Sequence, residues 1–386
     1  MLVRGIVDAV RSVVRAEAPV PLHAPEFRGR EREYLNDCID TGWVSSVGAY
    51  VDRFERDLEA VTGAARAVAV VNGTAALDVC LRLAGVVPGD EVLVPTLTFV
   101  ATANAVTYRG ATPHFVDSET LTMGIDPARL DAYLGRVAEV RSGTCVNRAT
   151  GAPIRALVAM HVFGHPCDIE GLQAVADRWR LTLIEDAAEA LGSRWRGRHA
   201  GTFGRLGALS FNGNKIVTTG GGGAVLTDDP ELGRRAKHLT TTAKVPHAWA
   251  FDHDEVGWNY RMPNLNAALG CAQLEQLPGL ISRKAELAGR YARAFVDIPG
   301  VRVFQPRGGA EVNHWLNAIL LEQAEQATRD AVLDALNAEG LGARPLWTLM
   351  HRLPMYAACP RDELPVAEAL AARVINLPSS AALVAA

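Results

Sequence analysis

Long apolar runs, a dominant charge and closely spaced cysteines are all missing from this chain. No hydrophobic stretch approaches the roughly 20 residues needed to cross a bilayer. The net charge of −4, from 39 basic and 43 acidic residues, provides no bulk attraction to nucleic acid. Charged and apolar residues alternate over residues 1–27, so the continuous apolar core of a signal peptide is absent as well. We therefore expect a soluble, cytoplasmic protein that binds neither membranes nor nucleic acid.

The cysteines are few and scattered, and none of them forms a CxxC pair. They are Cys38, Cys80, Cys145, Cys167, Cys271 and Cys359. This spacing predicts free thiols rather than disulfides or a zinc site. His161 and His165 lie close together, but no third ligand accompanies them at zinc spacing. We therefore predict no metal site.

Apolar segments alternate with helical patterns along most of the chain. Strands are expected at 67–71, 91–95, 112–116, 155–160, 181–184 and 224–226. Such alternation favours a parallel or mixed sheet with helices on both faces. From residue 301 onward, shorter strands surround a helical pattern at 327–339. We predict an N-terminal helical extension (1–20), a large α/β domain (21–279) and a small C-terminal α+β domain (280–386).

Proline and glycine positions suggest where individual helices begin and end. Pro278 and Gly279 are expected to stop a helix that begins at Asn264, with a second helix following at 280–295. A helix is expected from Pro127 to about Val140. The polar residues 141–154 then predict a hairpin-like insertion.

The stretch from 181 to 229 combines an acid after a buried strand with a lysine among glycines. Asp186 follows the strand, and Lys215 ends the segment SFNGNK, which precedes four consecutive glycines. Open α/β sheets bind ligands at the carboxyl ends of their strands, although Asp186 taken alone could equally cap a helix. A pyridoxal phosphate enzyme needs such a pair. Its lysine forms a Schiff base with the cofactor, and its carboxylate keeps the pyridine nitrogen protonated.

The segment SFNGNKIVTTGGGGAVLTDD (210–229) resembles the lysine block of the DegT/DnrJ/StrS sugar aminotransferases. The resemblance covers residues 21–380 and implies a fold-type I pyridoxal phosphate transaminase. More narrowly, the block is similar to the branch that aminates UDP-linked 4-keto-6-deoxy-N-acetylhexosamines. That branch leads to bacillosamine or legionaminic acid in surface polysaccharide and lipopolysaccharide biosynthesis. The resemblance thus implies amino transfer from glutamate to the 4-keto carbon of a nucleotide sugar.

The resemblance also assigns roles around the cofactor. Lys215 would be the Schiff-base lysine, Asp186 the partner of the ring nitrogen, and Glu189, one helical turn later, a neighbour of the ring hydroxyl. The other expected cofactor contacts are Gly73, Thr74, Ala75, Phe99, Ser210 and Asn212. From the residues alone, Glu189 could face solvent and Phe99 could belong to the core. The NGTAAL turn by itself is a weak indication of a phosphate site.

A second set of expectations concerns the partner subunit and the sugar. The segment GWNYRMPN (257–264) resembles a family motif whose asparagine reaches the cofactor phosphate of the other subunit. Asn259 therefore implies an obligate homodimer with shared active sites. The resemblance further places several residues at the nucleotide-sugar pocket. They are Asn313, His314, Arg344, Trp347 and His351.

Two alternative functions remain on the same fold. A pyridoxal phosphate-dependent sugar dehydratase is one, but such relatives carry histidine where this chain has Lys215. A non-catalytic regulator is the other, and the presence of both Lys215 and Asp186 argues against it. A Rossmann-type nucleotide site is excluded, because the glycines at 220–223 precede a strand instead of opening a helix.

Overall fold

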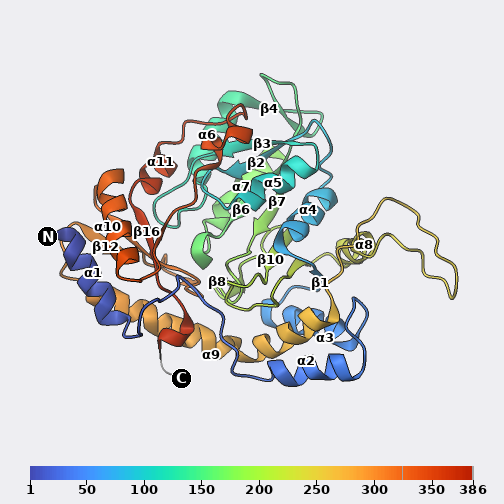
Figure 1. Ribbon diagram of the computed structural model, residues 1–386. Coiled ribbons are helices and arrows are strands. Elements are labelled where there is room, and N and C mark those ends of the chain that lie inside the picture. The colour runs from blue at the N-terminus through green and yellow to red at the C-terminus, as the bar shows by residue number, and fades with distance from the viewer. Residues whose placement is uncertain (324, 385–386) are drawn as a thin grey trace.

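The computed structural model describes residues 1–323 and 325–384 and has a seven-stranded sheet at its centre (Figure 1). Five of its strands run parallel: β10, β7, β6, β2 and β3. Strand β11 is antiparallel to both of its neighbours, so the sheet is mixed. The spatial order is β1 (Arg66–Val70), β11 (Gly223–Thr227), β10 (Leu206–Ser210), β7 (Thr182–Asp186), β6 (Ile154–Met160), β2 (Glu91–Pro95) and β3 (Thr112–Val116).

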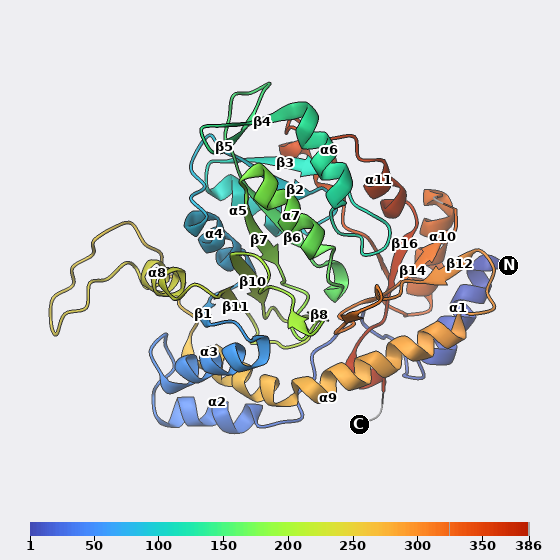
Figure 2. The same ribbon diagram turned by 180° about the vertical axis from the view of Figure 1, so that it is seen from behind.

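Helices cover both faces of this sheet. Helices α4 (Gly73–Leu83), α5 (Val100–Tyr108) and α8 (Pro230–Thr240) pack on one face. Helices α6 (Pro127–Val137) and α7 (Ile169–Trp179) cover the other, as the view from behind shows (Figure 2). Because both faces are covered, the strands are buried almost throughout, which explains their continuous apolar sequences.

A second, smaller sheet stands beside the first and is antiparallel. Its order is β12 (Val301–Val303), β14 (Asn317–Leu321), β16 (Val374–Leu377) and β15 (Arg344–Pro345). Helices α1 (Leu2–Val13) and α10 (Gln326–Ala338) share an apolar core with it, and α11 (Pro365–Ala371) packs nearby. The predicted architecture, a large mixed α/β sheet plus a small α+β unit, is confirmed.

The helix expected to stop at Pro278 does not stop there. Helix α9 (Asn264–Ala294) runs through Pro278 and spans the molecule from one core to the other (Figure 1). Its first half packs on α2 (Glu31–Asp40) and α3 (Ala49–Thr62), and its second half packs on α1. A proline inside a helix costs about 3 kcal/mol. Burial of leucines on both sides of the proline offsets this cost, so tertiary packing overrides the local signal. The predicted domain boundary at 279/280 lies inside this helix and stays a prediction.

Two expectations about helices were wrong, whereas the hairpin predicted for 141–154 is present and begins earlier, at Ala138. Helix α6 ends at Val137, and the chain forms the hairpin of β4 (Ala138–Arg141) and β5 (Thr144–Asn147). Ser142 and Gly143, both at positive φ, close its two-residue turn. After Asp186 the chain makes a turn instead of a helix. The remaining short elements are β8 (Arg194–Trp195), β9 (Arg198–His199), β13 (Ala310–Glu311), η1 (Val162–Gly164), η2 (Met350–Arg352), η3 (Pro354–Tyr356) and η4 (Ala381–Leu383).

The connection between α8 and α9 extends away from the body of the protein (Figures 1 and 2). Trp249, Phe251 and Val256 on this connection are largely exposed. Among the described residues, no helix combines the length and apolar character that spanning a membrane requires.

Gly207 allows a close approach that shapes the middle of the large sheet. A Cβ atom there would lie 2.0 Å from Gly201 O, and Gly201 N donates to the buried Glu185, the neighbour of Asp186. We predict that Gly207→Ala lowers the free energy of unfolding by about 1–3 kcal/mol or more, because the collision is with backbone. Urea denaturation measures this change.

Gly135→Ala is the matched control, because Gly135 lies exposed inside α6 and its Cβ would meet nothing within 4 Å. This variant should be stabilised by about 0.5–1 kcal/mol. Wild-type stability of Gly207→Ala would contradict the described approach of the two backbone segments.

Candidate active site

A cavity of about 320 Å³ opens at the carboxyl edge of strands β6 and β7. Its walls come from the start of α4, the start of α5, the turn after β7, the segment after β10 and the second sheet's loops. Nine of the predicted site residues line it: Gly73, Thr74, Phe99, Asp186, Glu189, Ser210, Asn212, Lys215 and Trp347. The sequence therefore identified positions that the fold brings together from distant parts of the chain.

Asp186 is the last residue of β7 and is 3% exposed. Its Oδ2 accepts a hydrogen bond from Thr102 Oγ1 at 2.7 Å, and its Oδ1 accepts one from Ala188 N at 3.2 Å. Burial raises the pKa of this carboxyl, while the Thr102 hydrogen bond, the Ala188 N–H and the nearby charge of Lys215 oppose the rise. The residue is a strand-end carboxylate with hydrogen-bond donors, and it does not cap a helix.

Lys215 reaches the cavity between a carboxylate and an indole ring. Its Nζ lies 3.3 Å from Glu189 Oε1 and 3.9 Å from the centre of the Trp315 ring. Trp315 Nε1 donates to Asn214 O at 2.7 Å, which holds the ring beside the lysine. A cation over an indole face is attracted electrostatically. Lys215 is therefore held in the cavity and is not a freely solvated loop charge.

Glu189 lies in the turn after β7, buried, and so does not face solvent. Its Oε2 accepts from Phe163 N at 2.9 Å. Burial raises the pKa of Glu189 to about 7, even though the Lys215 charge and the Phe163 N–H work in the opposite direction. A carboxyl of this kind can hold or release a proton near neutral pH.

The first turn of α4 and the end of β10 form a cradle with the properties of an anion site. Asn72 caps the helix by accepting from Ala75 N at 2.8 Å. A Cβ on Gly73 would lie 2.8 Å from Ser210 Cβ, so only glycine allows the helix start to approach Ser210 this closely. The N–H groups of a first helical turn have no carbonyl partner within the helix, and they attract anions. Gly73, Thr74 and Ser210 line the cavity here.

Two aromatic side chains form the outer wall. Phe99 precedes α5, is 49% exposed and meets Trp347 edge-to-face with ring centres 6.4 Å apart. Phe99 is therefore accessible from the cavity and is not a core residue. Trp347 also packs on Phe163, at 5.4 Å between ring centres.

Several predicted residues lie outside the lining of this cavity. Ala75 gives its N–H to the Asn72 cap. Asn313 is buried, and its amide nitrogen donates to Glu189 O at 2.8 Å and Leu191 O at 2.9 Å, so it supports the turn that carries Glu189. Burial lowers the pKa of His314 to about 4. Their predicted contacts with substrate or cofactor stay predictions.

Arg344 and His351 lie farther out than the sequence suggested. Arg344 is exposed on β15 and donates to Asn337 Oδ1 at 3.2 Å. His351 is engaged on both ring nitrogens, by Thr96 Oγ1 at 2.7 Å and Glu368 Oε1 at 2.8 Å. Asn259 is exposed and accepts from Arg261 Nε at 2.9 Å. None of the three lines the cavity within the described chain.

Sequence reasoning missed Thr102 and Trp315 at this site. Thr102 lies three residues after Phe99 on α5, so helical periodicity could have placed it one turn from the cavity wall. Trp315 directly follows Asn313 and His314, and from the residues alone a place in the core of the small domain is the commoner role for such a tryptophan. Its approach to Lys215 depends on two segments a hundred residues apart, and no local pattern shows such a contact.

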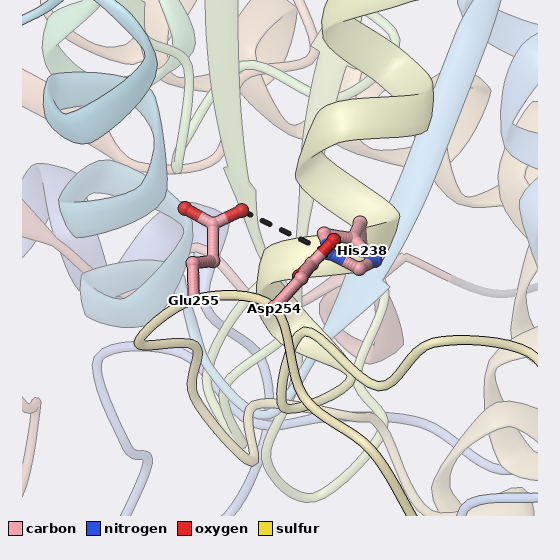
Figure 3. Close-up of side chains that lie close together, drawn as sticks. All are labelled: His238, Asp254 and Glu255. Atoms are coloured by element: carbon pink, nitrogen blue, oxygen red, sulfur yellow. Dashed lines mark hydrogen bonds and ion pairs between the residues drawn. The ribbon is translucent and has the colours of Figure 1, made fainter.

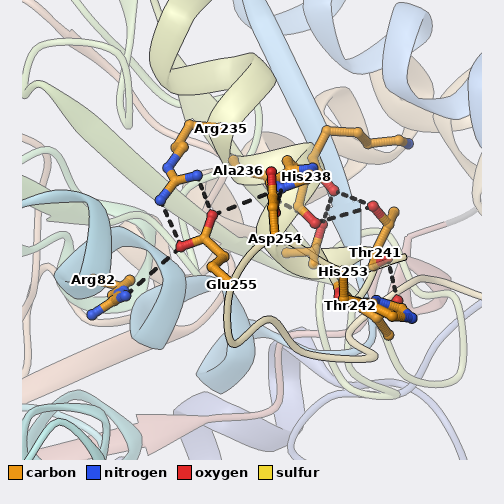
Figure 4. Close-up of polar contacts among 11 residues, drawn as sticks. Arg82, Arg235, Ala236, His238, Thr241, Thr242, His253, Asp254 and Glu255 are labelled. Atoms are coloured by element: carbon orange, nitrogen blue, oxygen red, sulfur yellow. Dashed lines mark hydrogen bonds and ion pairs between the residues drawn. The ribbon is translucent and has the colours of Figure 1, made fainter. Parts of the chain in front are cut away.

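The possibility of metal binding arises elsewhere, at the base of the projecting connection. Among the described residues, a group whose possible ligand atoms lie close enough together to hold a metal ion consists of His238, Asp254 and Glu255 (Figure 3). His238 Nε2 lies 2.7 Å from Asp254 Oδ1. Glu255 is already neutralised by Arg235, with Arg82 nearby at 3.9 Å (Figure 4). We interpret this group as an ion-pair network that fastens the connection to α8, and we retain the prediction of no metal.

Comparison with known proteins agrees with the geometry. The DegT/DnrJ/EryC1/StrS aminotransferase family matches residues 25–386. The chain belongs to this family. It is 37% identical over 366 residues to GDP-perosamine synthase of Caulobacter vibrioides, with 94% of each chain covered. It is 38% identical to the GDP-perosamine synthase of Escherichia coli O157:H7, with 93% of each chain covered. The crystal structure of the aminotransferase TlmJ from Streptoalloteichus hindustanus superposes with a TM-score of 0.84 at 28% identity, and 93% of each chain is covered.

The DegT/DnrJ/EryC1/StrS enzymes are pyridoxal phosphate-dependent, and the residues of this cavity fit the cofactor. A lysine, a strand-end carboxylate, an anion cradle and an accessible aromatic ring all face one space. The protein is a pyridoxal phosphate-dependent sugar aminotransferase. The narrower expectation of a UDP-sugar branch is not confirmed, because these two relatives are named for a GDP-linked sugar.

The raised pKa of Glu189 has a measurable consequence. Between about pH 4.5 and 7 the native state of the cofactor-free protein binds more protons at Glu189 than the unfolded chain does. The stability that this group contributes is therefore lost as pH rises through the window. We predict that Glu189→Gln removes this dependence, which amounts to roughly 1–3 kcal/mol across the window. Urea denaturation of both proteins at several pH values checks the prediction, and a wild-type slope in Glu189→Gln would contradict it.

Proposed function

We propose that this enzyme moves an amino group from glutamate to the 4-keto carbon of a GDP-linked 4-keto-6-deoxyhexose. The observation that carries the proposal is the meeting of Lys215, Glu189 and Asp186 in one cavity beside the α4 cradle. The names of the two GDP-perosamine synthases support GDP as the carrier. The UDP-linked N-acetylhexosamine expected from the lysine block is the competing acceptor.

Each side chain then has a defined task. When bound, pyridoxal phosphate supplies an electron sink for the carbon that loses its proton. Asp186 would keep a proton on the ring nitrogen, and Glu189 would lie near the ring hydroxyl. Lys215 would hold the cofactor covalently and, as a free amine, would move a proton to or from C4 of the sugar. Glu189, 3.3 Å from Lys215 Nζ, stabilises the protonated amine between these transfers.

The remaining residues bind and orient the cofactor. Gly73, Thr74, Ser210 and Asn212 surround the position that we assign to its phosphate. Phe99 would pack against the ring face, a contact worth roughly 0.5–1.5 kcal/mol beyond its buried area. Trp347 and Phe99 also restrict water at the cavity mouth, which strengthens the electrostatic interactions inside.

An amino-transfer assay with glutamate and a panel of GDP- and UDP-linked 4-keto-6-deoxy sugars tests this proposal. We expect a yellow protein that aminates the GDP-linked acceptors with the higher kcat/KM. Lys215→Ala should lose amino transfer together with the borohydride-reducible lysine–cofactor adduct. Preference for UDP-linked acceptors would reverse the choice of carrier. A reducible adduct on another lysine in Lys215→Ala would refute the assignment of Lys215.

We also propose that the enzyme is an obligate homodimer whose sites are shared. Tyr260 O accepts from Val71 N at 2.9 Å, which places the segment around Asn259 beside the end of β1. Asn259 itself is exposed and lies outside its own chain's cavity, as a residue serving a partner's phosphate should. A second cavity of about 650 Å³ beside this segment is lined by Trp43, Val47 and Arg261 and provides apolar surface for an interface.

Subunit mixing tests the shared site. Lys215→Ala and Asn259→Asp should each be inactive, the second because a negative charge beside a phosphate repels it in a water-poor pocket. In a mixed dimer one site carries both lesions and the other carries neither, so up to half the sites regain activity. Absence of recovery under verified subunit exchange would show that Asn259 acts within its own chain. The cytoplasmic location also stays a prediction.

A further inference from the structure

Thr102 donates a side-chain hydrogen bond to the carboxylate of Asp186. Its Oγ1 lies 2.7 Å from Asp186 Oδ2, and the two residues are 1% and 3% exposed. An ionised carboxylate accepts hydrogen bonds and cannot donate them. The hydroxyl proton of Thr102 therefore points at Asp186, in a place that water does not reach.

A second buried threonine sets the direction of this hydroxyl. Thr98 Oγ1 lies 2.7 Å from Thr102 Oγ1 and 2.8 Å from Met160 Sδ. Because Thr102 gives its only proton to Asp186, the bond between the two threonines requires Thr98 as donor. A thioether sulfur is a weak acceptor, so the hydroxyl of Thr102 is the better partner for Thr98. The two hydroxyls form a chain of donors that ends at Asp186, and each bond polarises the next.

The hydrogen bond from Thr102 favours the ionised form of Asp186, which burial disfavours. Burial raises the pKa of Asp186, and the Thr102 hydrogen bond is the first of the contacts that lower it. The groups facing Asp186 from other elements are Lys215 after β10, His161 after β6, Glu189 in the adjacent turn and Cys80 on α4. Helix α5 contributes the Thr102 hydroxyl, a neutral donor with a fixed direction.

We propose that Thr102 is a positioning residue for amino transfer: its hydroxyl, oriented by Thr98, keeps Asp186 ionised and aimed at the ring nitrogen of the cofactor. The inference rests on the proposed role of Asp186. The same first turn of α5 follows Phe99, which lines the cavity. The helix start thus supports the cofactor's ring face and, through Asp186, its nitrogen.

The isosteric pair Thr102→Val and Thr102→Ser tests this in the holoenzyme. Valine keeps the shape without the hydroxyl, and serine keeps the hydroxyl. With cofactor labelled with nitrogen-15 at the ring, the chemical shift of that nitrogen reports its protonation independently of turnover. We expect Thr102→Val to move the signal toward the unprotonated position and to lower kcat about 10- to 100-fold, as loss of a hydrogen bond to a charged group does. Thr102→Ser should stay close to wild type in both measurements.

Thr107→Val is the matched control on the same helix. Thr107 is exposed and donates to Ala103 O at 3.2 Å, so this variant should behave as wild type. A wild-type nitrogen signal and kcat in Thr102→Val would overturn the proposal. Equal impairment of the serine and valine variants would overturn it too, because packing alone would then explain the effect.

Asp186→Asn separates this inference from the function on which it rests. The asparagine variant should bind cofactor and lose the protonated-nitrogen signal. If that signal persists, the proposed role of Asp186 fails; if it is lost while Thr102→Val stays at wild type, the role of Thr102 alone fails. Should Thr102→Val not fold, Thr98→Val takes its place. We expect a smaller change in the same direction there, and an unchanged signal would overturn the proposal.

Discussion

The free-energy cost of burying charge governs the arrangement of this active site. Asp186 and Glu189 are buried and Lys215 is partly buried where they meet in one cavity, and an unpaired buried charge is expensive. Each of them has a partner: Asp186 accepts two hydrogen bonds, and Glu189 pairs with both Lys215 and the Phe163 N–H. The turn after β7 and the start of α5 supply partners for these charges, and this requirement fixes the positions of both segments beside the cavity.

Close approach between backbone segments is the second requirement. Gly73 lets the N-terminus of α4 reach Ser210, so that the helix start and the end of β10 can share one anion. Gly207 lets its own strand, β10, approach Gly201. The N–H of Gly201 in turn donates to Glu185, the residue before Asp186. A side chain at either position would separate the elements that form the cavity. The glycines therefore contribute to function through packing geometry rather than through flexibility.

The second sheet is fastened to the site by a buried lysine on α9. Lys284 is fully buried and donates to Trp315 O at 3.1 Å and Ser379 O at 2.5 Å, and burial lowers its pKa to about 7. The Nζ atom of Lys215 lies over the ring face of Trp315. Helix α9 thereby connects the core around α2 and α3 with the wall of the cavity. Because the helix continues through Pro278, a single element makes this connection.

The sequence by itself determined the alternation of strands and helices, the family, and nine of the residues that line one cavity at the ends of the strands. These features follow from local patterns: an acid after an apolar strand, a lysine among glycines, and an asparagine–glycine turn before a helix. Only the tertiary structure decided that α9 continues through Pro278 and that Thr102 and Trp315 contact Asp186 and Lys215. It also decided that Asn313, Arg344 and His351 lie outside the cavity. The physical reason is that burial, ring stacking and side-chain hydrogen bonds depend on which distant segments pack together, and local spacing does not encode that.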